Sequence, residues 1–190
     1  MIFDQTALSR GRLRAARHPE RAEFLLARTA EALADRIAMF KQPFGPALDL
    51  GCHHGLLRSV LESTGRIGPI TAVDWPPGPL HPTAQVIATP VALPFADGSF
   101  DLIASAYGLQ FVEDLAVALS EVRRCLRPGG LALLAVCGEE TQEPLRAGLL
   151  AGQLALGRAP SPFVVPAIDI RDAGGLLQRA GFVDPVVDRD

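Results

Sequence analysis

Several features that mark particular classes of protein are missing from this sequence. No apolar stretch approaches the ~20 residues needed to cross a bilayer, and the longest, residues 130–137, has the length of a strand. Positive charge is not in excess, since the formal net charge is −3, and this argues against a nucleic-acid partner. The three cysteines are odd in number and show no CxxC spacing, so we expect reduced thiols, no metal site and a cytoplasmic location.

The composition itself is globular, with 48% of the residues hydrophobic and 21% charged. Arginines crowd the start of the chain, but acidic residues lie among them, so we expect a solvated basic segment rather than a targeting signal. From Pro19 to Phe40 apolar residues recur at helical spacing, which predicts an amphipathic helix. We therefore expect an N-terminal helical segment over residues 1–45 and an α/β domain over residues 46–190, in one compact unit.

The rest of the chain alternates short apolar runs with helical patterns. Strands are predicted at residues 47–51, 70–74, 85–88, 100–106, 131–136 and 183–187, and helices at 55–63, 112–126, 145–156 and 172–180. Such alternation predicts a parallel, doubly wound sheet. Ligands of these sheets bind beyond the carboxyl ends of the strands, where the strand order reverses.

The first predicted strand runs into Asp-Leu-Gly-Cys-His-His-Gly at residues 49–55. Gly51 and Gly55 have no Cβ and let the backbone approach a ligand closely, and the helix that follows offers free N–H groups. Asp74 ends the second strand, where an acidic side chain can accept two hydrogen bonds from a ribose diol. Loop, helix and acid together predict a nucleotide-type site.

Two classes of cofactor use this layout. A dinucleotide site requires further glycines where this chain has His53 and Leu56, so a NAD-dependent dehydrogenase is disfavoured. S-adenosylmethionine has no phosphate and carries a cationic amine and a sulfonium, for which the carboxylate of Asp49 is a suitable neighbour. Asp49 could instead tie the loop together by hydrogen bonds.

Four segments in order resemble the class I S-adenosylmethionine-dependent methyltransferases. Residues 47–55 are similar to the glycine-rich first motif of that family, and Asp74 to its ribose-binding acid. Residues 93–102 resemble the approach to the fourth strand, and residues 121–130 the helix and turn before the fifth. The resemblance covers roughly residues 46 to 136 and implies a Rossmann-like fold with S-adenosylmethionine as cofactor.

The resemblance implies a cofactor site composed of Asp49, Gly51, Cys52, His53, Gly55, Asp74, Trp75, Val91, Ala92 and Ser105. Trp75 either lies against the adenine or caps the core. Tyr107 and Gln110 follow the fourth strand and are substrate-side candidates, with packing as the alternative interpretation. No catalytic residue is predicted, because positioning the two reactants can supply most of the rate of methyl transfer.

Three departures from the family pattern stand out. His53 replaces the usual middle glycine, and residues 89–91, Thr-Pro-Val, offer no carboxylate for the adenine amino group. The sequence given ends at Asp190, with no residues for the seventh strand of the fold. We expect an exposed sheet edge as a result, which would allow a homodimer to form.

Both ends of the chain resemble one branch of the family more narrowly. Ile2-Phe3-Asp4 with the arginine-rich run, and residues 169–187, are similar to bacterial relatives of a mitochondrial complex I assembly factor that hydroxylates an arginine. The malonyl-carrier-protein methyltransferases of biotin synthesis are close to this branch. We therefore weigh a methyltransferase acting on a protein, a carrier-bound group or a small molecule against a hydroxylase or assembly factor, and against a non-catalytic binding module.

Overall fold

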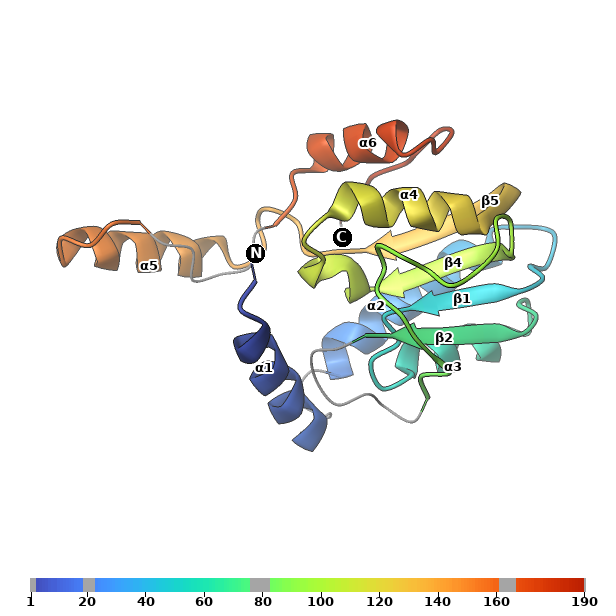
Figure 1. Cartoon of the computed structure of the whole chain (residues 1–190), viewed down its shortest axis with the longest axis horizontal. Coiled ribbons are helices and arrows are strands. Elements are labelled where there is room, and N and C mark those ends of the chain that lie inside the picture. Colours follow the sequence, from blue (N-terminus) through green and yellow to red (C-terminus); the bar gives the residue numbers. More distant parts are fainter. Residues whose placement is uncertain (1–2, 19–22, 76–82, 161–166, 190) are drawn as a thin grey trace.

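The computed structural model describes residues 3–18, 23–75, 83–160 and 167–189 (Figure 1). Its centre is a parallel sheet of five strands in the order β3-β2-β1-β4-β5. The strands are β1 (Ala47–Leu50), β2 (Ile70–Asp74), β3 (Val86–Ile87), β4 (Phe100–Ala106) and β5 (Leu126–Ala135). This doubly wound order confirms the predicted class I methyltransferase type of sheet.

Helices cover both faces of the sheet. On one face α2 (Glu23–Ala38) and α3 (Leu56–Ser63) pack on alternate strand residues such as Ala47 and Ala104. On the other, α4 (Leu115–Cys125) packs on Leu48 and Ile103, and α6 (Ile170–Arg179) lies against α4. Successive residues of a strand point to opposite faces, so two covered faces demand the continuous apolar runs seen in the sequence.

The strand order reverses at β1. The chain passes from β1 outward to β2 and β3, and then returns to the other side of β1 with β4 and β5. The registers pair Leu50 with Val73 and Asp49 with Ala104, so the ends of β1, β2 and β4 meet at one edge of the sheet. The segments after these three strands therefore form the switch point where a ligand would bind.

The arginine-rich start of the chain forms a helix, α1 (Gln5–Arg17), none of whose described residues is buried. The Asp4 side chain caps it by accepting hydrogen bonds from the Thr6 and Ala7 amides at 2.8 and 3.1 Å. Alanine, leucine and arginine favour helix, and the cap supplies its start. The helix predicted from Pro19 is described from Glu23, since residues 19–22 lie outside the described residues.

The strand predicted at residues 183–187 does not form. Val183 and Val186 are 84% and 86% exposed, so this segment buries no face against the sheet. Among the described residues β5 has only β4 as a neighbouring strand, apart from an isolated bridge between Gly138 and Ile168. The strand predicted at residues 183–187 is therefore wrong, and this segment does not pair with the outer edge of β5.

Helix α5 (Glu143–Ala155) projects away from the sheet and the other helices (Figure 1). Its exposed apolar residues include Leu145, Leu150 and Leu154, at 51%, 45% and 58%. None of the helices within the described residues is long and apolar enough to span a membrane.

Candidate functional site

The loop after β1 turns through three residues with positive φ: Gly51 at +80°, His53 at +48° and Gly55 at +85°. The Gly51 amide donates to the Val73 carbonyl of β2 at 2.8 Å, which holds the loop against that strand. A Cβ on Gly51 would lie 2.5 Å from the Cα of Gly108, so no larger residue fits there. His53 adopts a left-handed conformation, which costs a non-glycine residue about 1–2 kcal/mol, and the loop thereby keeps its turn without the middle glycine.

Helix α3 starts directly at this loop. Gly55 is its N-cap residue and has no side chain to bond the amides of the first turn. These N–H groups and the helix dipole point toward the carboxyl edge of the sheet, as in other nucleotide loops of this type. The loop therefore presents donors to a ligand rather than consuming them in a cap.

Asp49 is the least satisfied group of the site. Its side chain is fully buried, and neither carboxylate oxygen has a hydrogen-bond partner among the described residues. Burial raises the pKa of Asp49 from 3.8 to about 7, the Arg58 amide lowers it, and the nearby Asp74 raises it further. A buried carboxylate without a partner is costly unless a cation or a donor compensates it. This position thus fits the cationic amine or sulfonium of S-adenosylmethionine.

Asp74, at the end of β2, is buried like Asp49 but is fully engaged. Its Oδ2 accepts from Arg12 at 2.5 Å, and its Oδ1 accepts from the Trp75 amide at 2.9 Å. The same Arg12 guanidinium donates to the Trp75 carbonyl at 2.5 Å. Arg12 lies 62 residues before Asp74, so no local sequence pattern predicts this ion pair.

Trp75 reaches over the glycine loop. A Cβ on Gly51 would lie 3.2 Å from Cη2 of the Trp75 ring, and the ring also packs against the core cluster that contains Leu50 and Val73. The position of the Trp75 ring is compatible with both interpretations, contact with an adenine and packing on the core.

Burial favours the neutral forms of the Cys52 thiol and the His53 imidazole in the loop. Burial, helped by Asp49 and Asp74, raises the pKa of Cys52 to about 12, so the thiol is not an activated nucleophile. Burial lowers the pKa of His53, against a raising effect of Asp74 and a lowering effect of Arg12. Within the described residues, no three His, Cys, Asp or Glu side chains are placed to hold a metal ion.

The remaining predicted site residues surround the loop at different depths. Ser105 is buried at the end of β4 and donates from Oγ to the Leu50 carbonyl at 2.6 Å, which ties β4 to β1. Val91 packs against the core cluster that also contacts Trp75, and Ala92 is exposed. The structure therefore brings Ser105 to the loop, but shows no polar contact that would place Ala92 there.

The two substrate-side candidates follow β4. Tyr107 has a φ of +60° and its hydroxyl shares a 2.8 Å hydrogen bond with Oγ1 of Thr29 on α2. Gln110, in the 3-10 turn η2 (Gly108–Phe111), accepts from the Cys137 amide at 2.6 Å. Both side chains thus link the carboxyl ends of strands to neighbouring segments, as the packing interpretation requires.

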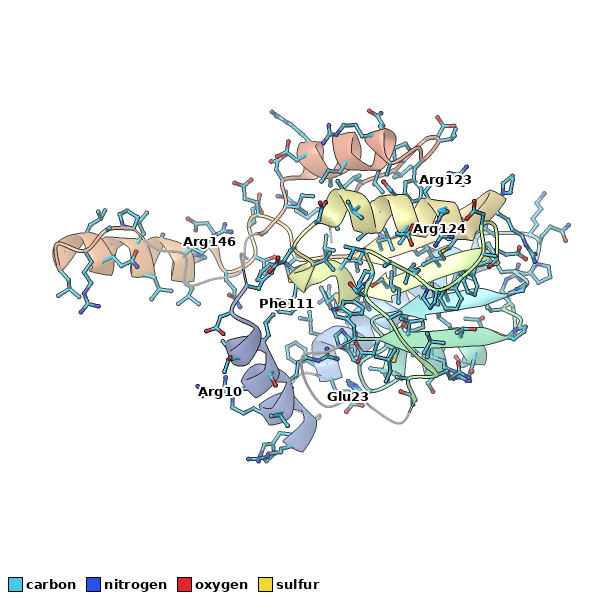
Figure 2. All side chains as sticks on the ribbon, in the orientation of Figure 1. Arg10, Glu23, Phe111, Arg123, Arg124 and Arg146 are labelled. Carbon is cyan, nitrogen blue, oxygen red and sulfur yellow. The ribbon has the colours of Figure 1, made fainter. Side chains whose placement is uncertain are left out.

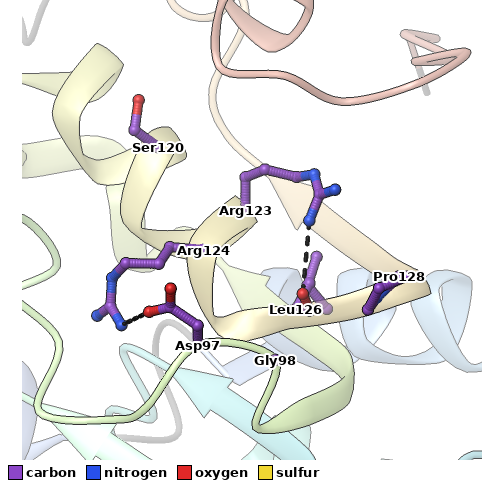
Figure 3. Close-up of a pocket in the computed structure, with 7 residues that line it drawn as sticks. All are labelled: Asp97, Gly98, Ser120, Arg123, Arg124, Leu126 and Pro128. Carbon is purple, nitrogen blue, oxygen red and sulfur yellow. Dashed lines mark hydrogen bonds and ion pairs between the residues drawn. The ribbon is translucent and has the colours of Figure 1, made fainter.

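A second polar cluster lies at the opposite, amino end of β4 and β5 (Figure 3). Arg124 of α4 donates to Asp97, to Glu121 and to the carbonyls of Leu93 and Phe95, at 2.7–3.0 Å. The hydrogen bond from Arg124 lowers the pKa of Glu121. Figure 3 also shows the neighbouring Arg123 bonded to the Leu126 carbonyl.

Comparisons with known proteins agree with this architecture. The model of the methyltransferase domain family matches residues 48–134. The chain is 33% identical to the human mitochondrial arginine-hydroxylase NDUFAF5, over 100% of this chain and 57% of the relative. It is 29% identical to malonyl-[acyl-carrier protein] O-methyltransferase 1 of Coxiella burnetii, over 98% of this chain and 64% of the relative. The chain therefore spans less than two thirds of the length of these relatives.

Solved structures show the same fold. A Haloferax volcanii methyltransferase, in complex with the Trm112 methyltransferase activator, has a TM-score of 0.64 at 20% identity, covering 87% of this chain and 72% of that one. Haemonchus contortus phosphoethanolamine N-methyltransferase 2, bound to S-adenosyl-L-methionine, has a TM-score of 0.59 at 17% identity, covering 82% and 36%. Residues 48–134 thus match the methyltransferase domain family, and the chain is similar to the arginine-hydroxylase and malonyl-carrier-protein methyltransferase branches.

Proposed function

We propose that this domain binds S-adenosylmethionine at the loop after β1 and transfers its methyl group. The observation that carries the proposal is Asp49, a buried carboxylate with no hydrogen-bond partner in the part of the chain that the structure describes, two residues before the glycine that the loop geometry requires. Gly51 and Gly55 would admit the ligand close to the backbone, and Asp74 would bind the ribose. When bound, the cofactor supplies an electrophilic methyl group on a sulfonium.

The protein's own residues contribute charge and position. A cationic ligand favours the ionised form of a neighbouring carboxyl, so ligand binding lowers the pKa of Asp49 and releases a proton near neutral pH. Because burial raises the pKa of Cys52 to about 12, its thiol stays protonated and does not compete with the acceptor for the methyl group. Methyl transfer to a positioned acceptor gains about 7–11 kcal/mol from orientation alone, which is consistent with a site without an evident general base.

Calorimetric titration with S-adenosylhomocysteine tests the cofactor proposal. We expect binding whose affinity rises between pH 6 and pH 8 as Asp49 ionises, with proton release visible in buffers of different ionisation enthalpy. Asp49→Asn should weaken binding at least tenfold and abolish the pH dependence, because the carboxylate is lost. An exposed Asp172→Asn variant is the matched control. Absence of heat at millimolar ligand would refute the proposal.

The acceptor is proposed to be a protein, a carrier-bound group or a small molecule, because one relative is named for methylating malonyl-[acyl-carrier protein]. Incubating the protein with methyl-labelled cofactor and an acyl-carrier protein loaded with a malonyl group tests the carrier class. A labelled carrier protein supports a carrier-bound acceptor. If the carrier stays unlabelled but a protein in an added cell extract becomes labelled, the acceptor is a different protein. Cofactor binding without label in any fraction would favour the non-catalytic binding module.

Arginine hydroxylation is the second candidate, favoured by 33% identity to an arginine-hydroxylase across 100% of this chain. Mass spectrometry of respiratory complex I subunits from a deletion strain tests it. An arginine that gains oxygen only when this protein is present supports hydroxylation, and unmodified arginines in both strains oppose it.

A cytoplasmic location and a homodimer through the free edge of β5 complete the proposal. Residues 130–137 at this edge carry no charged side chain, and uncharged edges favour pairing with another strand. Light scattering after size exclusion should give twice the 20.2 kDa chain mass. Replacing Leu133, a half-exposed residue of β5, with Lys should then give a monomer.

A further inference from the structure

Helix α1 contacts the rest of the protein at the cofactor site itself. Arg12, in the middle of the helix, donates to the Asp74 carboxylate and to the Trp75 carbonyl. The ion pair is largely shielded from water, with side-chain exposures of 25% for Arg12 and 2% for Asp74. At the start of the helix, Phe3 packs edge-to-face on Phe111 with ring centroids 5.9 Å apart. Phe111, labelled in Figure 2, belongs to the turn that follows β4.

These contacts use the atoms that a ribose would need. Asp74 Oδ1 accepts from the Trp75 amide and Oδ2 from Arg12, so a diol that binds both carboxylate oxygens competes with Arg12 for Oδ2. The Trp75 ring, whose backbone Arg12 holds, extends over Gly51. In the described conformation the candidate site is therefore covered at two places: Arg12 lies on Asp74, the candidate ribose-binding residue, and the Trp75 ring lies over the glycine loop.

The same contacts can be released without disturbing the core. Neither buried core cluster among the described residues includes a residue of α1. Leu13 of α1 is 46% exposed, and the neighbouring Arg10 and Arg14 are exposed or partly so. A helix that adds no side chain to either of these core clusters can move as a unit while the sheet stays folded.

We propose that α1 is a latch on the cofactor site: Arg12 keeps Asp74 and Trp75 closed in the free protein and must leave Asp74 when the ribose binds. The proposal rests on the proposed function, since the adenosyl cofactor is the ligand that displaces Arg12. Asp74 exchanges one partner for another and is never left buried and unpaired. A closed population lowers the apparent affinity by the fraction of open molecules.

Trp75 provides a direct readout, because it is the single tryptophan of the chain. Arg12→Ala should open the latch without ligand, which would shift the Trp75 emission to longer wavelength and increase its quenching by acrylamide. Arg14→Ala, on the same helix and exposed, is the matched control and should leave the emission unchanged. Unchanged Trp75 emission in a folded Arg12→Ala protein would overturn the latch.

Ligand binding gives the second readout. Arg12→Ala should bind S-adenosylhomocysteine about tenfold more tightly and associate faster, as expected for removal of a closed state populated at about 90%. Weaker or equal binding by this variant would overturn the latch and make Arg12 either a ligand contact or a purely structural residue. Loss of binding in wild type and both variants, with the expected fluorescence change in Arg12→Ala, would refute the proposed cofactor while keeping the closed contact.

Discussion

The two polar clusters at opposite ends of the sheet differ in how completely their charges are paired. At the amino end, Arg124 places its guanidinium on two carboxylates and two carbonyls. At the carboxyl end, Asp49 is buried with no partner, and His53 and Tyr107 have positive φ values. A network in which every polar group has a hydrogen-bond partner stabilises the fold. A buried polar group without a partner and a strained backbone are retained where a bound ligand supplies the missing interactions.

The four segments that resemble the methyltransferase family also separate into two that lie at the candidate site and two that lie at the opposite end of the sheet. Residues 93–102 and 121–130 meet at Arg124, where Glu121 also accepts from the Leu93 amide at 2.8 Å. They lie at the end of the sheet away from the glycine loop. Only residues 47–55 and Asp74 lie at the candidate site. Half of the recognisable motifs are therefore structural.

The largest expected effect is on the free energy of unfolding, which should depend on pH through Asp49. Its pKa is raised to about 7 on folding, so the folded state binds more protons than the unfolded chain between about pH 4 and pH 7, and stability is lost as pH rises through this range. Asp49→Asn should therefore stabilise the ligand-free protein by up to about 3–4 kcal/mol at pH 8 and little at pH 4. Urea unfolding at the two pH values measures it. An equal change at both pH values would mean that folding does not raise the pKa of Asp49, and a loss of stability at pH 8 would mean that Asp49 is paired.

Gly51→Ala should destabilise the protein by about 3 kcal/mol, from the left-handed φ and from overpacking against Gly108. Gly65→Ala is the matched control, because Gly65 also has a positive φ but a Cβ there would meet nothing within 4 Å. The control should lose only about 1 kcal/mol. Thermal unfolding compares the two variants. Equal losses of stability would contradict the close approach of Gly51, after β1, to Gly108, after β4.

Arg124→Ala should lower stability by about 2–3 kcal/mol, because the Leu93 and Phe95 carbonyls and Glu121 lose their donor. The side chain is 31% exposed, so water replaces part of the lost bonding. Arg123→Ala, which loses two weaker bonds at 3.1 and 3.4 Å, should cost less. Affinity for S-adenosylhomocysteine should be unchanged in both variants, and a change would give the amino end a role in binding.

Tyr107→Phe should have the smallest effect on stability, about 1 kcal/mol, from the lost hydrogen bond to Thr29. Thr29→Val removes the same bond from the other side. If Tyr107 only packs, both variants should behave alike in unfolding and in methyl transfer. A tenfold lower rate in Tyr107→Phe alone, with unchanged affinity for S-adenosylhomocysteine, would assign the phenol to the substrate side.

Much of the fold was predictable because parallel strands that are covered on both faces are visible in the sequence as continuous apolar runs. The predicted strands at residues 70–74 and 100–106 match β2 and β4, and the first differs from β1 by one residue. β5 starts five residues earlier than predicted, because Leu126 already pairs with Phe100 before a register shift. The predicted helix at 112–126 starts instead at Leu115, where Asp114 caps it.

The sequence alone determined the order of strands and helices, the glycine loop and the acid at the end of β2, because these depend on local periodicity and on residues close together in the chain. Tertiary structure decided which charges are paired. Asp49 has no hydrogen-bond partner on either oxygen within the described residues, and Asp74 is engaged because α1 brings Arg12 to it across 62 residues. Pairing of this kind depends on distances between segments, which no local pattern encodes.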